Sequence, residues 1–163
     1  MNKLSLITTI AVILIAGASG YYLINLKQGL YPASSFISLQ YKWGEGDTLI
    51  NSYNSATGSY QYLDHRDSLI TKKVKLNANN IIFLHSRANE AGLWQLPEVI
   101  GKTNEAKADT ALRYEFVFNY EQNTKKIVFY PSQVDNVALA DSASKLLAAI
   151  EQTIKDAEER TGN

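Results

Sequence analysis

The sequence predicts an α+β fold in which an N-terminal apolar helix precedes a β-β-β-β-α-β-β-α domain. Three observations support this prediction: an uncharged apolar segment at residues 4–26, six segments whose apolar residues alternate, and two segments whose apolar residues recur every three or four positions. Alternation is typical of half-buried strands, and the longer spacing is typical of helices with one apolar face. We expect an antiparallel sheet with both domain helices packed on one of its faces.

The apolar segment at residues 4–26 is expected to be a transmembrane signal-anchor. As a helix it would span about 35 Å, which is enough to cross a bilayer core of roughly 30 Å. Lys3 and Lys27 flank it. The positive charge at the N-terminal end favours the cytoplasmic side, so the rest of the chain would face the extracytoplasmic side, as in a bacterial envelope protein.

The same stretch also resembles a cleavable export signal. Ala16, Gly17 and Ala18 form a small-x-small site of the kind that signal peptidases cut. Cleavage near Ala18 would release a secreted protein instead of a membrane-anchored one. Both interpretations place the domain outside the cytoplasm. Because the charge difference between Lys3 with the terminal amine and Lys27 is small, an inverted orientation with a cytoplasmic domain is a further alternative.

These patterns divide the chain into four parts. They are a signal-anchor or signal peptide at 1–27, a linker at 28–35, an extracytoplasmic α+β domain at 36–160 and a tail at 161–163. A domain of about 125 residues is large enough to fold around one hydrophobic core.

Alternating apolar residues mark six strands. The predicted strands are 36–43, 48–54, 59–63, 68–76, 111–120 and 125–130. One face of the first strand is expected to carry Ile37, Leu39, Tyr41 and Trp43. Short polar turns join the first four strands, which predicts an antiparallel meander.

Two helices complete the predicted domain. The first runs over 78–91, between Asn77 as its cap and Gly92, which suits the left-handed end of a helix. The second runs over 140–158. Segment 93–101 is expected to be an ordered connector, and 102–110 a polar loop. Since two helices with one apolar stripe each cannot cover both faces of six strands, the second face must be polar, sheltered by the connector, or used for binding.

Composition excludes several classes of function. The chain has no cysteine, so disulfides, thiolate nucleophiles and Cys-ligated metals are excluded. Basic and acidic residues are balanced at 16 each, which is not the basic character of a nucleic-acid-binding protein. No phosphate loop, nucleophile elbow or metal-ligand spacing is present, and we expect no cofactor and no metal.

Two histidines are the candidates for acid-base catalysis. His65 lies in the sequence DHRD, and His85 lies on the apolar stripe of the first predicted helix. A secreted hydrolase that uses one of them with nearby acids is one alternative hypothesis. The turn-forming aspartates around His65 and the helical position of His85 favour structural roles.

Aromatic residues are the one biased feature of the sequence, because the full chain contains ten tyrosines. The candidate binding residues are Tyr41, Trp43, Tyr53, Tyr60, Tyr62 and Trp94. Tyrosine brings a large contact area and a hydrogen bond at low entropic cost. The sequence therefore predicts a non-enzymatic, membrane-tethered domain that binds an envelope partner. A second alternative is a sensor of a small apolar ligand held between the sheet and the helices.

Overall fold

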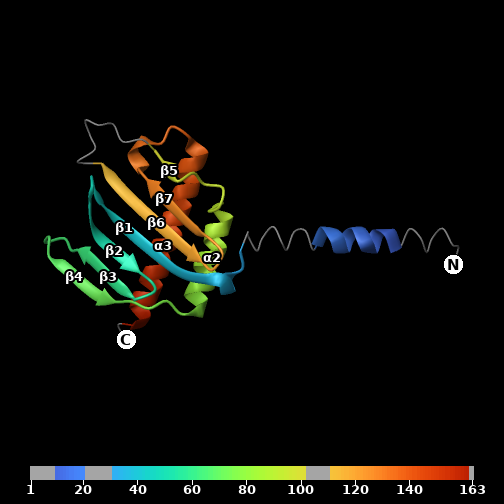
Figure 1. Ribbon diagram of the computed structural model, residues 1–163, viewed down its shortest axis with the longest axis horizontal. Helices are drawn as coiled ribbons and strands as arrows, with labels where there is room; N and C mark the ends of the chain where they lie inside the picture. Colours follow the sequence, from blue (N-terminus) through green and yellow to red (C-terminus); the bar gives the residue numbers. More distant parts are fainter. Residues whose placement is uncertain (1–9, 21–30, 102–110, 162–163) are drawn as a thin grey trace.

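The computed structural model describes residues 10–20, 31–101 and 111–161. In these ranges the chain forms three helices and a seven-stranded, mostly antiparallel open sheet (Figure 1). The first helix covers residues 10–20. The other elements are η1 (Ala33–Ser35), β1 (Phe36–Glu45), β2 (Thr48–Asn54), β3 (Ser59–Leu63), β4 (Leu69–Lys73), α2 (Ala78–Glu90), β5 (Val99–Ile100), β6 (Leu112–Tyr120), β7 (Thr124–Phe129), η3 (Pro131–Gln133) and α3 (Val137–Thr161). The predicted α+β class is confirmed.

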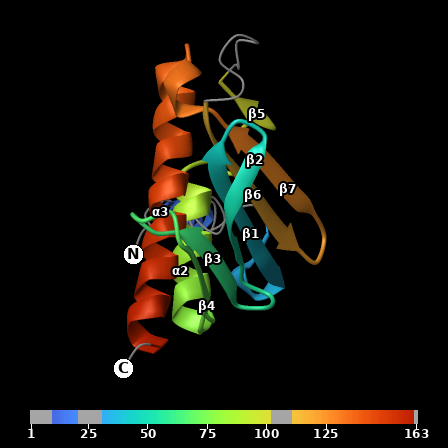
Figure 2. The same ribbon diagram turned by 90° about the vertical axis from the view of Figure 1, so that its left-hand side faces the viewer.

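The sheet has the strand order β4-β3-β2-β1-β6-β7-β5. Figure 2 shows that α2 and α3 both lie against one face of the sheet, and no helix of the described residues covers the other. This two-layer arrangement agrees with the prediction. It gives the sheet an inner face toward the helices and an outer face toward solvent.

One strand was not predicted. Val99 and Ile100, at the end of the expected connector, form β5 and pair in parallel with Val128 and Phe129 of β7. The prediction of a wholly antiparallel, six-stranded sheet was therefore wrong at this edge. Two residues are too short to show alternation, and the strand exists because β7 offers its free edge.

The start of β1 also differs from the prediction. Its pairing with β6 shifts between Phe36 and Ser38, so one extra residue is inserted there. The extra residue reverses the alternation. Phe36 consequently packs edge-on against Tyr120 with ring centroids 5.5 Å apart, whereas Ile37, expected on the buried face, is 58% exposed.

Helix α2 begins and ends as predicted. The Asn77 side-chain oxygen accepts a hydrogen bond from the Asn80 amide, and the Asn80 side-chain oxygen accepts one from the Asn77 amide. At the other end Gly92 has φ +76°, and the Leu93 amide donates to the Ala88 carbonyl over 3.0 Å. This left-handed ending turns the buried Leu93 back onto the helix.

Helix α3 is longer than the predicted 140–158. It begins at Val137, directly after Asn136, whose side-chain oxygen accepts hydrogen bonds from the Ala138 and Leu139 amides. An asparagine in this position caps a helix in the same way as Asn77 does in α2.

The core lies between the inner face of the sheet and the two helices. Its fully buried members include Leu39, Leu84, Phe116, Phe118, Ile127, Phe129, Leu146 and Ile150. The outer face is polar over much of its area, which was one of the three predicted possibilities, although Ile50, Leu69 and Val99 are exposed on it. Cross-strand pairs there include Lys42 with Glu115, Lys42 with Ser52, and Gln61 with Thr71.

The predicted membrane segment lies only partly in the described residues. Residues 10–20 are helical, whereas 4–9 and 21–26 lie outside the described residues. Within the described ranges, no helix combines the length and apolar character that crossing a bilayer requires. The predicted loop at 102–110 also lies outside the described residues.

Candidate functional site

Five of the six predicted binding residues lie together on the inner face of β1, β2 and β3. Tyr41 is paired with Tyr53, and Tyr53 with Tyr60, so the three rings form a row across the strands. Tyr41 and Tyr53 are buried, at 2% and 1% exposure. Trp43, Tyr60 and Tyr62 remain half-buried. The sequence predicted an aromatic sheet surface without deciding which face carries it, and the structure places these five residues on the face that α3 covers.

The rings contact one another in a continuous series. Tyr41 stacks on Trp43 with centroids 4.6 Å apart and planes 15° apart. The ring centroids of Trp43 and Tyr60 lie 6.2 Å apart, and those of Tyr60 and Tyr62 lie 4.9 Å apart. Aromatic pairs at such separations contribute about 0.5–1.5 kcal/mol beyond the area they bury. The contacts therefore hold the half-exposed rings in fixed positions.

A cleft of about 340 Å³ opens where α3 passes over these rings. We call it the aromatic cleft. Its lining residues are Tyr41, Trp43, Tyr60, Glu151, Ile154, Lys155 and Glu158. Trp43 also lines an adjoining hollow of about 440 Å³ beside the turn between β1 and β2. The indole thus forms the boundary between the two hollows.

Two carboxylates from α3 face the aromatic cleft. The Tyr41 hydroxyl donates a hydrogen bond to Glu151 Oε1 over 3.1 Å. Glu158, two helical turns further along, forms an ion pair with Lys72 of β4. Within the part of the chain that the structure describes, Glu151 forms no ion pair.

Burial and the nearby carboxylates raise the pKa of the phenols in the aromatic cleft and of the neighbouring Tyr114. Burial, followed by the negative charge of Glu151, raises the pKa of Tyr41 far above its ordinary value of 10.0. Burial, followed by the charge of Glu158, raises the pKa of Tyr60 to about 12. Burial and then Glu151 also raise the pKa of Tyr114. The phenols are therefore neutral hydrogen-bond donors in an electronegative site.

Trp94 does not join the aromatic cleft. It lies after α2 and packs edge-on against Tyr31, at 4.6 Å, and against Tyr120, at 5.3 Å. These rings form a second aromatic cluster, which seals the region where η1 enters the domain. The grouping of Trp94 with the other five residues in one surface is not seen.

The two histidines occupy different environments. His65 is exposed, and in its turn Asp64 Oδ1 accepts hydrogen bonds from the Arg66 and Ser68 amides. His85 is 8% exposed, and its Nδ1 lies 2.9 Å from the hydroxyl oxygen of Tyr120. Neither histidine lines the aromatic cleft. Among the described residues, no group of three or more histidines and acids is placed to hold a metal ion.

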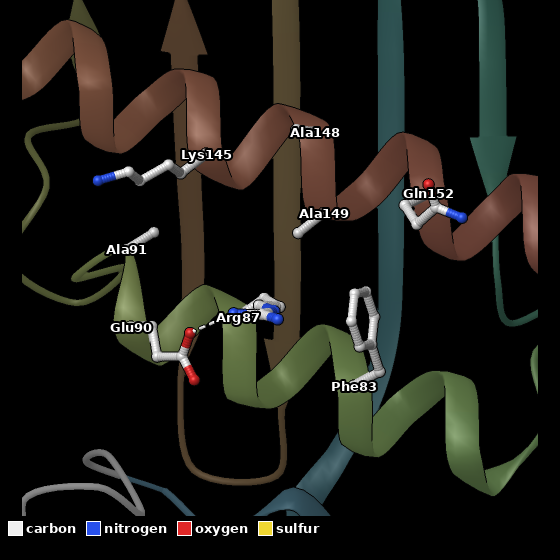
Figure 3. Close-up of a pocket in the computed structure, with 8 residues that line it drawn as sticks. All are labelled: Phe83, Arg87, Glu90, Ala91, Lys145, Ala148, Ala149 and Gln152. Carbon is white, nitrogen blue, oxygen red and sulfur yellow. Dashed lines mark hydrogen bonds and ion pairs between the residues drawn. The ribbon is translucent and has the colours of Figure 1, made fainter.

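A second concavity lies between the helices. It is a groove of about 490 Å³. Figure 3 shows that Phe83 of α2 and Ala149 of α3 point into it. Arg87 and Glu90 form an ion pair at 2.8 Å on its edge, so their charges compensate each other. Alanines make up much of its remaining wall. The groove therefore has few polar groups that could form specific hydrogen bonds or ion pairs with a ligand.

Sequence reasoning missed the α3 half of the site. Glu151, Lys155 and Glu158 lie at spacings of four and three on α3, so they share one side of that helix. They are adjacent to the buried Ile150 and Ile154. This position at the border of the apolar stripe is the signal that distinguishes them from fully solvated charges.

Comparison with protein-family models found no match, and comparisons with curated proteins and with solved structures found no significant similarity. The function is therefore argued from the geometry of the aromatic cleft.

Proposed function

We propose that this chain is a non-enzymatic binding domain that recognises another envelope component through the aromatic cleft. The observation that carries the proposal is the half-exposure of Trp43 and Tyr60 in a concave site. Their neighbours Tyr41 and Tyr53 on the same face are fully buried. Aromatic area left open in a hollow, beside a few polar groups, is typical of binding sites.

The rigidity of the aromatic cleft supports the same proposal. Trp43 is stacked on Tyr41, which is itself held by Glu151. A site whose side chains are already ordered loses little conformational entropy when a partner binds. The two glutamates favour a partner with polar or charged groups over a wholly apolar ligand.

The proposal includes a membrane tether. The support comes from the sequence: residues 4–26 carry no charge, and Lys3 precedes them. A tethered domain would meet its partner at the membrane surface, where both are concentrated. Secretion after cleavage near Ala18 remains the alternative, and the domain would act in the same compartment.

Site-specific photo-crosslinking tests the binding role. A benzoylphenylalanine is placed at Tyr60, in the aromatic cleft, or at Gln61, the next residue on β3, whose side chain lies on the outer face. The full chain is irradiated in intact cells. We expect a discrete adduct from position 60 and little from position 61, because adjacent strand residues face opposite sides.

A second substitution makes the test specific to the aromatic cleft. Trp43→Ala, combined with the probe at position 60, should reduce the adduct several-fold because the stacked wall is lost. Purified adduct partner should then bind the wild-type chain saturably and bind Trp43→Ala more weakly. Adducts of equal yield from positions 60 and 61 would contradict the proposal.

A further inference from the structure

The aromatic cleft holds one negative charge that its own residues leave uncompensated. Glu158 is paired with Lys72. Lys155 could neutralise Glu151, but its side chain is 68% exposed and its Nζ lies 3.9 Å from Glu159 instead. Glu151 is therefore held by the Tyr41 hydroxyl alone among the described residues, and a hydrogen bond from a neutral phenol leaves its charge in place.

The walls beside this charge also attract cations. Trp43 and Tyr60 line the same hollow as Glu151. The faces of aromatic rings carry negative partial charge, and a cation placed over them is stabilised by about 0.5–1 kcal/mol at exposed sites. The carboxylate and the two rings therefore all favour a cation, and the lysine that lines the same hollow, Lys155, has its charge compensated by Glu159.

We propose that the aromatic cleft binds an organic cation, namely the ammonium or guanidinium end of a lysine or arginine side chain that a partner protein inserts between β1, β3 and α3. This inference rests on the proposed function and names the group that the binding domain recognises. Charge complementarity is the argument for this occupant: Glu151 lacks an ion-pair partner in the described chain. An anion would be repelled by Glu151, whereas the charge of Glu158 is compensated by Lys72.

Two further observations agree with this assignment. The hollow of about 340 Å³ suits the end of one long side chain better than a helix or a strand. Burial is the main cause of the raised pKa of Tyr41, Tyr60 and Tyr114, and the charge of Glu151 adds to each of these shifts, so its field reaches all three rings.

The test uses the full chain in a neutral detergent micelle, in a Trp94→Phe background that leaves Trp43 as the fluorescent reporter. The probes are N-acetyl-lysinamide, N-acetyl-argininamide and N-acetyl-norleucinamide, the last being an uncharged analogue of the first. We expect the two cationic probes to change Trp43 emission saturably. The norleucine probe should bind at least about 5-fold more weakly.

A matched pair of variants on α3 isolates Glu151. Glu151→Gln removes the charge inside the aromatic cleft, and Asp156→Asn removes the same charge from a residue of α3 that does not line it and does not contact Lys155. We expect Glu151→Gln to weaken lysinamide binding about 5-fold and Asp156→Asn to leave it unchanged. Equal effects of the two variants would overturn the inference, because they would indicate a general effect of net charge.

Other outcomes separate this inference from the proposed function. Equal binding of the norleucine and lysine probes would overturn cation recognition while leaving the binding role intact. Tetramethylammonium binding without lysinamide binding would point to a choline head group and overturn the side-chain assignment. No response to any probe would also overturn it, and crosslinking at positions 60 and 61 would then decide the binding role alone.

Discussion

The Tyr41 hydroxyl and Glu151 Oε1, 3.1 Å apart, join β1 to α3 at the floor of the aromatic cleft. Tyr41 belongs to the core, with 2% of its surface exposed, whereas Glu151 is exposed. The bond therefore links a buried residue of the core to an exposed residue of the proposed binding site. Its removal should affect the stability of the fold as well as the position of the carboxylate.

Tyr41→Phe keeps the stacked ring and removes this hydrogen bond. We expect the free energy of unfolding to fall by about 1 kcal/mol, the usual net contribution of one such bond. Urea unfolding followed by circular dichroism measures the change. Tyr114→Phe is the control, because the Tyr114 ring stacks on Tyr41 but no hydrogen bond of its hydroxyl is seen within the described residues. Equal losses in the two variants would show that the bond adds nothing to stability.

The buried phenols predict a loss of stability at alkaline pH. Burial raises the pKa of Tyr60 and Tyr120 to about 12, from an ordinary value of 10.0. Between these values the unfolded chain releases protons that the folded chain retains, so the pH rise favours unfolding. The stabilisation is complete below pH 10 and declines as the pH approaches 12.

Urea unfolding at a series of alkaline pH values, with tyrosinate absorbance recorded in parallel, checks this expectation. In Tyr120→Phe the free energy of unfolding should fall less steeply with rising pH, because one phenol that ionises more readily in the unfolded chain is removed. If all ten tyrosines ionised near their ordinary pKa of 10.0 while the chain stayed folded, burial would not raise the pKa of Tyr60 and Tyr120, and the prediction would be wrong.

Gly101 is expected to be far less tolerant of substitution than Gly92. Gly101 has φ +90°, and a Cβ there would lie 2.5 Å from the Tyr130 carbonyl oxygen. Gly92 has φ +76°, but its nearest neighbour would be Gln95 Oε1 at 3.6 Å. We expect Gly101→Ala to reduce the free energy of unfolding by about 2–3 kcal/mol and Gly92→Ala by about 1 kcal/mol.

Hydrogen exchange locates the damage from Gly101→Ala. The Val128 and Tyr130 amides donate to the Glu98 and Ile100 carbonyls, which hold β5 against β7. Both amides should exchange faster in this variant and remain protected in Gly92→Ala. Unchanged protection would mean that β5 accommodates the methyl group without moving.

The tether predicts a membrane-bound full-length chain. Intact mass spectrometry of the protein from membrane and soluble fractions should find a species that retains residues 1–26, in the membrane fraction and extractable only with detergent. A mature protein that begins at Ser19 and is soluble would show instead that the segment is removed at Ala18.

Local signals made much of the fold predictable. Asn77 and Gly92 mark the ends of α2 because capping depends on the residues next to the helix end. The strand β5 could not be predicted, because its two residues are a strand only through pairing with β7. Similarly, the inserted residue at the start of β1, which exposes Ile37, depends on the register with β6.

The site was predictable by half. Alternation placed Trp43 on the apolar face of its strand, and Tyr60 with Tyr62 on one face of theirs. The pairing of the strands brings these faces together, and the position of α3 determines which rings are covered. Glu151 and Glu158 are charged residues on a helix, and nothing local shows that they border an aromatic hollow. Trp94 was grouped with the others by residue type, and only the tertiary structure separates it from them.

The order of the elements along the chain has a consequence for biogenesis. Helix α3 follows every strand of the sheet and supplies Leu146, Ile150 and Ile154 to the core. While the ribosome is still making residues before 137, the inner face of the sheet lacks its main cover, so the nascent chain has no complete core to fold around. If the chain is exported as proposed, this delay keeps it unfolded, and so able to pass through a translocation pore, until α3 has been synthesised.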